Sequence, residues 1–439
     1  MKYGSLKLNR VDIYFVHMLL LFLGISHYFG ITFLNIAITV LIGFVLIFSE
    51  NFEKRIVILF TLLPFFNLFT TEIGNTSLYY LFLIFVLFSV IKKNNWKIKK
   101  GKIWLVLCGI IITLFWRDIV VQIKWILVFS FLCIMTDNSQ LEKSMPMLIK
   151  HISISTIVAS VIGYLMMIMD KSIYNNSIVY LSGKTITRFA GLIGDSVFYS
   201  QFCVILIACI LAFCIMHKLS IRFSIFTSII LSGFVLITYS KTGIILLVFT
   251  FICYALVYIK NNLKNNTTVI KAIFFSIVFL IVTILTVNYI VKHQNTDLIK
   301  SFMLRFSAKD LWTGRNSVSE SYFEKLNSSI IYMLHGMSIS MYTSNGAVVG
   351  ATMITRAHNI YLETLCLFGV LPAIFIGILA VKKIYNIVRK KRNFLCQIIP
   401  TVVLLLSGIS LHGHIEWPYY FLVLLCYSTL GYVEKEEWF

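Results

Sequence analysis

A histidine, an amide and a carboxylate lie at the start of TRAHNIYLETLCLFGVLP, residues 355–372, which otherwise has the composition of a membrane helix. An imidazole titrates near neutral pH, so His358 could be a general base that takes a proton from an alcohol. Asn359 could orient the imidazole or bind a sugar, and Glu363, about one helical turn further on, could reach the same surface. The alternative is a histidine buried at the start of a span, with no chemical role.

Cationic side chains on the predicted external side could bind an anion beside that base. They are Arg188, Arg305, Arg315 and Arg356, with Lys241 in the stretch TYSKTG. A guanidinium pairs with two oxygens at once, which suits a phosphate or a carboxylate. Any one of them could instead pair with an acid or reach lipid headgroups. The acids in these loops are Asp195, Asp297, Asp310, Glu320 and Glu324. Because these acids are few, the set as a whole predicts an anion site.

No motif for nucleotide or metal chemistry accompanies these residues. The sequence has no G-x-x-x-x-G-K-[ST] loop and no G-x-G-x-x-G fingerprint, and it lacks an Asp-x-Asp pair for Mg²⁺. His412, His414 and Glu416 alternate and could bind zinc from one face of an extended loop. We favour a membrane-interface loop anchored by Trp417. The site is therefore expected to work without a metal or other cofactor, with cationic side chains neutralising a phosphorylated substrate.

Membrane helices must position these residues. The 439-residue chain is 59% hydrophobic and 13% charged, whereas a soluble domain carries about 25% charged residues. Apolar runs of roughly 17–23 residues recur, the length that crosses about 30 Å of hydrocarbon. The first run follows a basic head without a small-residue cleavage site, which predicts an uncleaved span. The predicted fold class is all-α: a polytopic integral membrane protein with about 14 (12–14) transmembrane helices and a large external loop containing short amphipathic helices.

The chain is predicted to be a single polytopic domain, residues 1–439, with external loops at 170–195 and 293–357. In the longer loop, DLIKSFMLRFS and NSVSESYFEKLNSSIIYML have apolar residues at helical spacing, so amphipathic helices are expected along the membrane surface. The expected spans lie near residues 12–29, 31–48, 55–70, 77–92, 102–117, 119–135, 148–169, 196–217, 221–239, 242–259, 271–292, 358–380, 394–411 and 417–433.

The basic residues indicate the orientation. With a cytoplasmic N-terminus, most of the 38 lysine and arginine residues fall on the cytoplasmic side, and Lys124 is left inside a span. This pattern accounts for the net charge of +20 better than nucleic-acid binding does. Both termini are therefore predicted to be cytoplasmic. The nine cysteines lie inside apolar runs, which excludes a disulfide framework and a C-x-x-C metal motif.

The segment that begins at His358 resembles the signature of the O-antigen ligase and polymerase superfamily. That signature is His, then Asn, Ser or Gln, nine residues, Gly, two residues, and Gly, Thr or Tyr. His358, Asn359 and Gly369 fit it, and Pro372 departs from it at a packing position.

Three further stretches resemble the same family, in the same order along the chain. RFAGLIGDSVFYSQ (188–201) resembles its Arg-Phe-x-Gly…Asp segment, and TGRNSVSESYFE (313–324) resembles the Gly-Arg stretch of its large external loop. YSKTG (239–243) resembles its Ser-Arg-x-Gly turn, with Lys241 in place of the arginine. The resemblance covers roughly residues 185–380.

The resemblance implies a membrane glycosyltransferase that uses an undecaprenyl-diphosphate-linked oligosaccharide as donor. His358 would deprotonate an acceptor sugar hydroxyl, which displaces the lipid diphosphate at the anomeric carbon. Arg188 and Arg315 would grip the diphosphate. The remaining assignments carried over are diphosphate binding for Lys241, Arg356 and Arg305, and contacts with the sugar or acceptor for Asn359, Glu363 and Asp195.

Three functions remain open at this point. A polymerase joins lipid-linked repeat units into O-antigen or a related surface polysaccharide, and a ligase transfers finished polymer to lipid A-core or another acceptor. The abundance of Ile, Lys, Asn and Phe implies AT-rich codons, which are frequent in surface-polysaccharide gene clusters and favour the polymerase. A transporter or flippase for the same lipid-linked sugar is the rival, but the ionisable groups gather at one face. Lys124 is the main exception, and we expect it to pair with Asp118 or to snorkel.

The expected location is the cell inner membrane, in a multi-pass arrangement. The expected partners are the undecaprenyl-diphosphate-linked oligosaccharide, membrane lipid, a chain-length regulator and a flippase, without nucleic acid.

Overall fold

A computed structural model describes residues 10–49, 51–69, 77–93, 98–136, 138–169, 178–181, 184–262, 315–344, 347–349, 352–354, 357–389, 395–410 and 417–432. Within these residues the chain is largely helical, with two short antiparallel hairpins. Three of the described helices are long and apolar enough to cross a membrane, and several shorter apolar helices accompany them. The long ones cover Gln140–Met169, Ser196–Ile215 and Lys241–Lys260.

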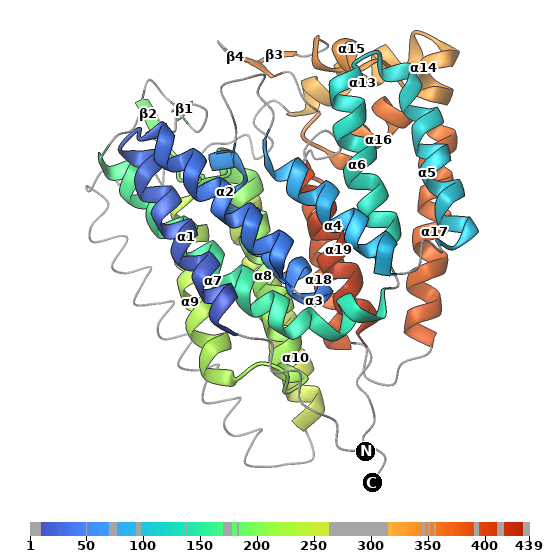
Figure 1. Ribbon diagram of the computed structural model, residues 1–439. Coiled ribbons are helices and arrows are strands. Elements are labelled where there is room, and N and C mark those ends of the chain that lie inside the picture. Colours follow the sequence, from blue (N-terminus) through green and yellow to red (C-terminus); the bar gives the residue numbers. More distant parts are fainter. Residues whose placement is uncertain are drawn as a thin grey trace.

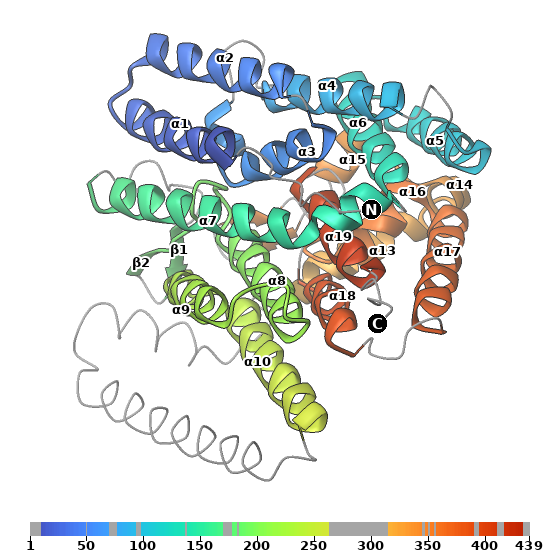
Figure 2. The same cartoon turned by 60° about the horizontal axis from the view of Figure 1, so that its bottom comes forward.

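The first part of the chain forms short helices that pack around a long one. The elements are α1 (Arg10–Tyr28), α2 (Thr32–Phe48), α3 (Phe52–Thr61), η1 (Leu63–Phe69), α4 (Tyr79–Lys93), α5 (Lys100–Thr113), η2 (Leu114–Trp116), α6 (Ile119–Met135) and α7 (Ser139–Met169). The side chain of Asp118 caps α6 by accepting a hydrogen bond from the backbone N–H of Val121 at 3.1 Å. Figure 2 shows α7 between α1–α3 on one side and α8–α10 on the other, and α7 packs against both groups.

The second part of the chain supplies the inner helices and the hairpins. Its elements are β1 (Ile178–Leu181), β2 (Lys184–Thr187), α8 (Ser196–Ile215), α9 (Ile221–Ile237), α10 (Lys241–Asn262), α13 (Arg315–Asn327), α14 (Ile330–His335), α15 (Ile339–Ser344), β3 (Ala347–Val349), β4 (Thr352–Ile354), α16 (Ile360–Phe368), α17 (Val370–Arg389), α18 (Leu395–Ser407) and α19 (Trp417–Gly431). Ile178 pairs with Thr187 in the first hairpin, and Ala347 pairs with Ile354 in the second.

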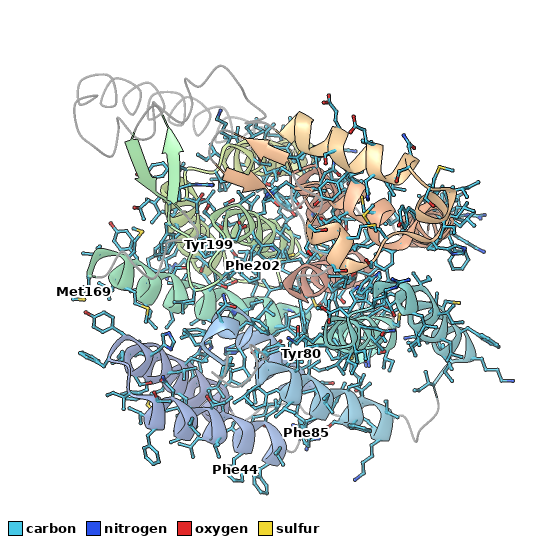
Figure 3. All side chains as sticks on the ribbon, turned by 90° about the horizontal axis from the view of Figure 1, so that it is seen from above. Phe44, Tyr80, Phe85, Met169, Tyr199 and Phe202 are labelled. Atoms are coloured by element: carbon cyan, nitrogen blue, oxygen red, sulfur yellow. The ribbon has the colours of Figure 1, made fainter. Side chains whose placement is uncertain are left out.

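Helix α8 lies in the interior. Of its most apolar window, 83% is buried, against 33% for α10. Tyr199 and Phe202 of α8 lie inside the molecule, whereas Phe44 of α2 and Met169 of α7 lie at its periphery (Figure 3). Large apolar side chains are exposed on many of the outer helices, among them Phe33, Phe48, Ile119 and Val381. Such a surface is unusual for a soluble protein and is compatible with a membrane protein.

The two ends of the helix bundle differ. The hairpins β1–β2 and β3–β4 and the helices α13–α15 lie at one end, which we call the loop end, opposite the end at which α10 and α17 finish (Figure 1). At the loop end α13, α14, α15 and α16 form a small layer, the cap, in which α16 contacts each of the other three. Val318, Tyr322 and Leu326 lie one turn apart on α13 and are buried. The segment 316–334, predicted to be helical, is thus present as α13 and α14, and α13 buries one face.

Helices occupy the positions of most predicted spans, but only three of the described helices are long and apolar enough to cross a membrane, and several spans differ in form. The span predicted at 358–380 is two helices, because the chain breaks at Gly369 between α16 and α17. The span predicted at 55–70 changes from α-helix to 3₁₀-helix near Leu63, where Pro64 follows. Helix α7 begins at Ser139, well before the predicted start at 148. The span predicted at 271–292 and the helix predicted in DLIKSFMLRFS lie outside the described residues.

Candidate functional site at the loop end

His358 lies in a short irregular segment before α16, in a backbone conformation that is unusual for a residue with a side chain. Its φ is +48°, in the left-handed region, which costs a non-glycine residue about 1–2 kcal/mol. Asn359 follows as the N-cap of α16, with its Oδ1 accepting from the N–H groups of Tyr361 and Leu362 at 3.0 and 3.2 Å. The N–H of Ile360 donates to the carbonyl of Gly408 at 2.8 Å, which ties this segment to the end of α18.

The break after α16 explains why polar residues begin an apolar run. Gly369 has φ +77° and ψ 175°, and it ends α16. The long helix α17 begins only at Val370, so His358 belongs to the cap and not to a continuous membrane helix. Gly369 lies against the end of α14, because a Cβ atom built on it would be 2.2 Å from the carbonyl oxygen of Leu334.

Glu363 is buried inside the cap, although the helical spacing predicted that it would reach the same surface as His358. Only 1% of the residue is exposed. Tyr342 of α15 lies close to it: burial raises the pKa of the Tyr342 phenol well above its usual range, and the charge of Glu363 raises this pKa further. The phenol therefore stays protonated at physiological pH, beside a buried carboxyl group.

Arg188 and Lys241 lie near one another at the loop end, where α9 ends and α10 begins. The Nε of Arg188 donates to the carbonyl of Thr238 at 2.9 Å, and Arg188 is 6% exposed. Tyr239 has φ +50° in the turn that follows, and Lys241 begins α10. The structure thus brings together two of the predicted cations that are 53 positions apart in the sequence, and the Nη2 of Arg188 and the Nζ of Lys241 are both buried.

The first turns of α8 connect this cationic pair to the segment of His358. Gly243 of α10 packs so closely on α8 that a Cβ atom there would be 2.5 Å from the Oγ of Ser200. The next residue, Gln201, donates from its Nε2 to the Oγ of Ser410 at 2.8 Å. Ser410 belongs to the turn after α18 whose Gly408 holds Ile360. Sequence reasoning missed Gln201 and Ser410 as site residues, because nothing in the sequence indicates that these two polar side chains meet.

Asp195 has a structural task at the loop end. Its Oδ1 accepts from the N–H groups of Val197 and Phe198 at 2.7 and 2.8 Å, so it is the N-cap of α8. Asn67 of η1 supports the preceding turn by donating to the carbonyls of Leu192 and Ile193. Contact between Asp195 and a sugar stays a prediction.

The remaining candidates are distributed as follows. Arg315 is the first residue of α13, in the cap. Arg305 and Arg356, and the competing group His412, His414 and Glu416, lie outside the described residues. Lys124 of α6 lies with its Nζ over the ring of Tyr80, 5.8 Å from the ring centroid, while the carboxylate of Asp118 caps α6. Within the part of the chain that the structure describes, no three His, Cys, Asp or Glu side chains form a group that could hold a metal ion.

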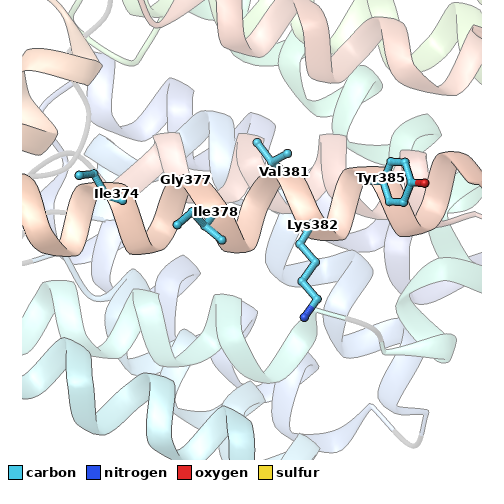
Figure 4. Close-up of a pocket in the computed structure, with 6 residues that line it drawn as sticks. All are labelled: Ile374, Gly377, Ile378, Val381, Lys382 and Tyr385. Atoms are coloured by element: carbon cyan, nitrogen blue, oxygen red, sulfur yellow. The ribbon is translucent and has the colours of Figure 1, made fainter.

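A groove of about 620 Å³ lies along α17, separate from these residues (Figure 4). It is lined by Ile374, Gly377, Ile378, Val381, Lys382 and Tyr385. Its walls are mostly aliphatic, so they suit an alkyl chain better than a sugar.

The chain was also compared with known proteins. No family model, curated protein or solved structure matches it.

Proposed function

We propose that the chain is an integral membrane glycosyltransferase that polymerises lipid-linked oligosaccharide repeat units into O-antigen or a related surface polysaccharide. One observation carries the proposal. Arg188, Lys241 and His358 each have a buried polar nitrogen atom, and contacts through the first turns of α8 connect them at the loop end. Ionisable groups buried in a membrane protein usually serve function rather than stability. A base and two cations at the same end of the molecule would suit transfer from a diphosphate donor.

In the proposed reaction His358 acts on the acceptor and the cations act on the leaving group. The imidazole takes the proton of an acceptor sugar hydroxyl, and the oxygen forms a new bond to the anomeric carbon of the donor. The bond between that carbon and the diphosphate oxygen breaks, and its electron pair leaves with the lipid diphosphate. Arg188 and Lys241 hold the negative charge that develops on this leaving group. Arg315, Arg356 and Arg305 complete the diphosphate site.

Asn359, Glu363 and Asp195 are proposed to contact the sugar or acceptor, each within limits set by its other contacts. The Oδ1 atoms of Asn359 and Asp195 serve as helix caps, and the side-chain amide nitrogen of Asn359 is the group proposed to contact a sugar. Glu363 is buried beside Tyr342 and would act from beneath the site.

The proposed orientation has the loop end outside and both termini in the cytoplasm, with fourteen spans in the inner membrane. Lys92 and Lys93 end α4 and Lys260 lies in the last turn of α10, which gives the opposite end its positive charge. Positively charged segments stay on the cytoplasmic side of a membrane. The proposed partners are the undecaprenyl-diphosphate-linked oligosaccharide, membrane lipid, a chain-length regulator and a flippase.

The experiment uses cells that lack the protein and carry wild type, His358→Ala or the control His217→Ala. His217 is exposed in the turn after α8, at the other end of that helix. Surface polysaccharide is resolved as a ladder on a gel. We expect single repeat units with His358→Ala and a full ladder with wild type and His217→Ala. Polymer that accumulates on the carrier lipid in cells lacking the protein would indicate a ligase. A full ladder with His358→Ala would remove the proposed base and favour the transporter.

A further inference from the structure

The backbone around His358 is held by three different elements. Asn359 caps α16, the N–H of Ile360 donates to the carbonyl of Gly408 after α18, and the N–H of Ala357 donates to the Oη of Tyr342 at 3.2 Å. A residue in a sparsely populated conformation keeps it only when its surroundings fix it, and such residues concentrate at functional sites. Tyr342 is the only one of these three anchors that comes from the predicted external loop.

Tyr342 is itself fixed inside the cap. The Oη of Tyr322 on α13 donates to the carbonyl oxygen of Tyr342 at 2.8 Å, and the centroids of the two rings are 5.1 Å apart. Both residues are 0% exposed, and Ala357 is 1% exposed. A buried hydroxyl in such a setting has little freedom to move, so it can hold a backbone amide in one place. The two tyrosines therefore link α13 and α15 to the residue that precedes His358.

We propose that Tyr342 is a positioning residue, whose hydroxyl holds the amide of Ala357 and thereby fixes the imidazole of His358 in the orientation needed to take a proton from the acceptor. This inference rests on the proposed function, since it assigns to the external loop the task of orienting the base of that reaction. Tyr342 contacts the backbone and not the substrate. Its loss would therefore lower the rate of transfer and leave the affinity for the donor largely unchanged.

The test compares Tyr342→Phe with the matched control Tyr254→Phe. Tyr254 on α10 is also a buried tyrosine, and its Oη donates to the carbonyls of Ala208 and Cys396 at 2.7 and 3.0 Å, away from the cap. Both variants keep the ring and lose one buried hydroxyl, so they carry a similar cost in stability. His358→Ala is included to test the proposed function by itself.

Two readouts are measured on the purified full-length chain. The first is the rate of polymerisation with the lipid-linked repeat unit extracted from cells that lack the protein, as a function of its concentration. The second is the rate at which diethyl pyrocarbonate modifies His358, followed by mass spectrometry relative to the exposed His217. With Tyr342→Phe we expect kcat to fall by about 10- to 100-fold at an unchanged KM, and the modification of His358 to become faster. Tyr254→Phe should change neither readout.

The outcomes separate this inference from the proposed function. If His358→Ala is inactive while Tyr342→Phe keeps the wild-type kcat and the wild-type modification rate, the positioning role is overturned and the proposed function stands. An equal loss of activity in Tyr342→Phe and Tyr254→Phe would show a general structural effect, which also overturns it. If His358→Ala is fully active, the proposed function fails, and the modification rate alone decides whether Tyr342 holds His358.

Discussion

Replacing Gly369 by alanine should destabilise the protein at the junction between the cap and α17. The conformation of Gly369, φ +77° and ψ 175°, is essentially restricted to glycine, and a side chain there costs about 1–3 kcal/mol. The added Cβ would lie 2.2 Å from the carbonyl oxygen and 2.4 Å from the carbonyl carbon of Leu334, both of them backbone atoms. Moving the end of α14 away adds about 1–3 kcal/mol of overpacking. The expected loss of stability is therefore about 2–6 kcal/mol.

The assay is thermal unfolding in detergent, read together with the monodisperse fraction after heating. Gly377→Ala is the matched control, since Gly377 lies on α17 with no atom within 4 Å of its added Cβ, and alanine there favours the helix by about 1 kcal/mol. Gly369→Ala should melt well below wild type, and Gly377→Ala at or above it. Gly336 approaches Leu367 from the other side of the same contact. The loss of stability in the double variant Gly336→Ala with Gly369→Ala should therefore be smaller than the sum of the losses in the two single variants. If Gly369→Ala melted like Gly377→Ala, the close contact between α14 and α16 would be refuted.

Two further substitutions test single side chains of the site. Asn359→Ala removes the cap of α16 and should lower the free energy of unfolding by about 1 kcal/mol, whereas Asn359→Asp keeps the cap. If the aspartate variant has wild-type stability but lower activity, the side-chain amide contacts the proposed sugar. If its activity is also that of wild type, Asn359 serves only as a helix cap. Lys241→Gln removes a buried charge and should raise the KM for the proposed lipid-linked donor, whereas Lys241→Arg should preserve this KM, as measured by donor titration. An unchanged KM in the glutamine variant would exclude Lys241 from the proposed diphosphate site.

The helices could be predicted because the length of an apolar run is a property of the sequence alone. The break at Gly369 could not, since LCLFGVLP is continuously apolar and one glycine does not end a helix by itself. At Gly369 the end of α16 meets the end of α14, and this contact depends on how the helices α13–α15 pack. The burial of Glu363 could not be predicted either. Helical spacing predicts which face a residue shares, but it does not show that Glu363 is buried, with its charge acting on Tyr342 of α15.

The candidate site could be predicted by residue type and only partly by arrangement. An imidazole near a predicted membrane interface indicates a possible base, and guanidinium groups there indicate a possible anion site, and neither inference depends on the fold. Arg188 lies near the start of α10 because its Nε donates a hydrogen bond to the carbonyl of Thr238. The spacing of residues along the sequence does not indicate this hydrogen bond. Tyr342 gave no signal in the sequence, because a tyrosine in a loop is ordinary until its partners are known.

The contacts that hold His358 differ in when they become available during synthesis. Those within the cap join segments close together in the chain, as Gly336 does with Leu367, so they can form as soon as α16 has been made. The bond from Ile360 to Gly408 and the bond from Gln201 to Ser410 both require α18, which the ribosome makes later. We therefore expect the nascent protein to complete its cap first. It would acquire an ordered site only after α18 has been made, so under the proposed function an unfinished chain would not yet act on a lipid-linked sugar.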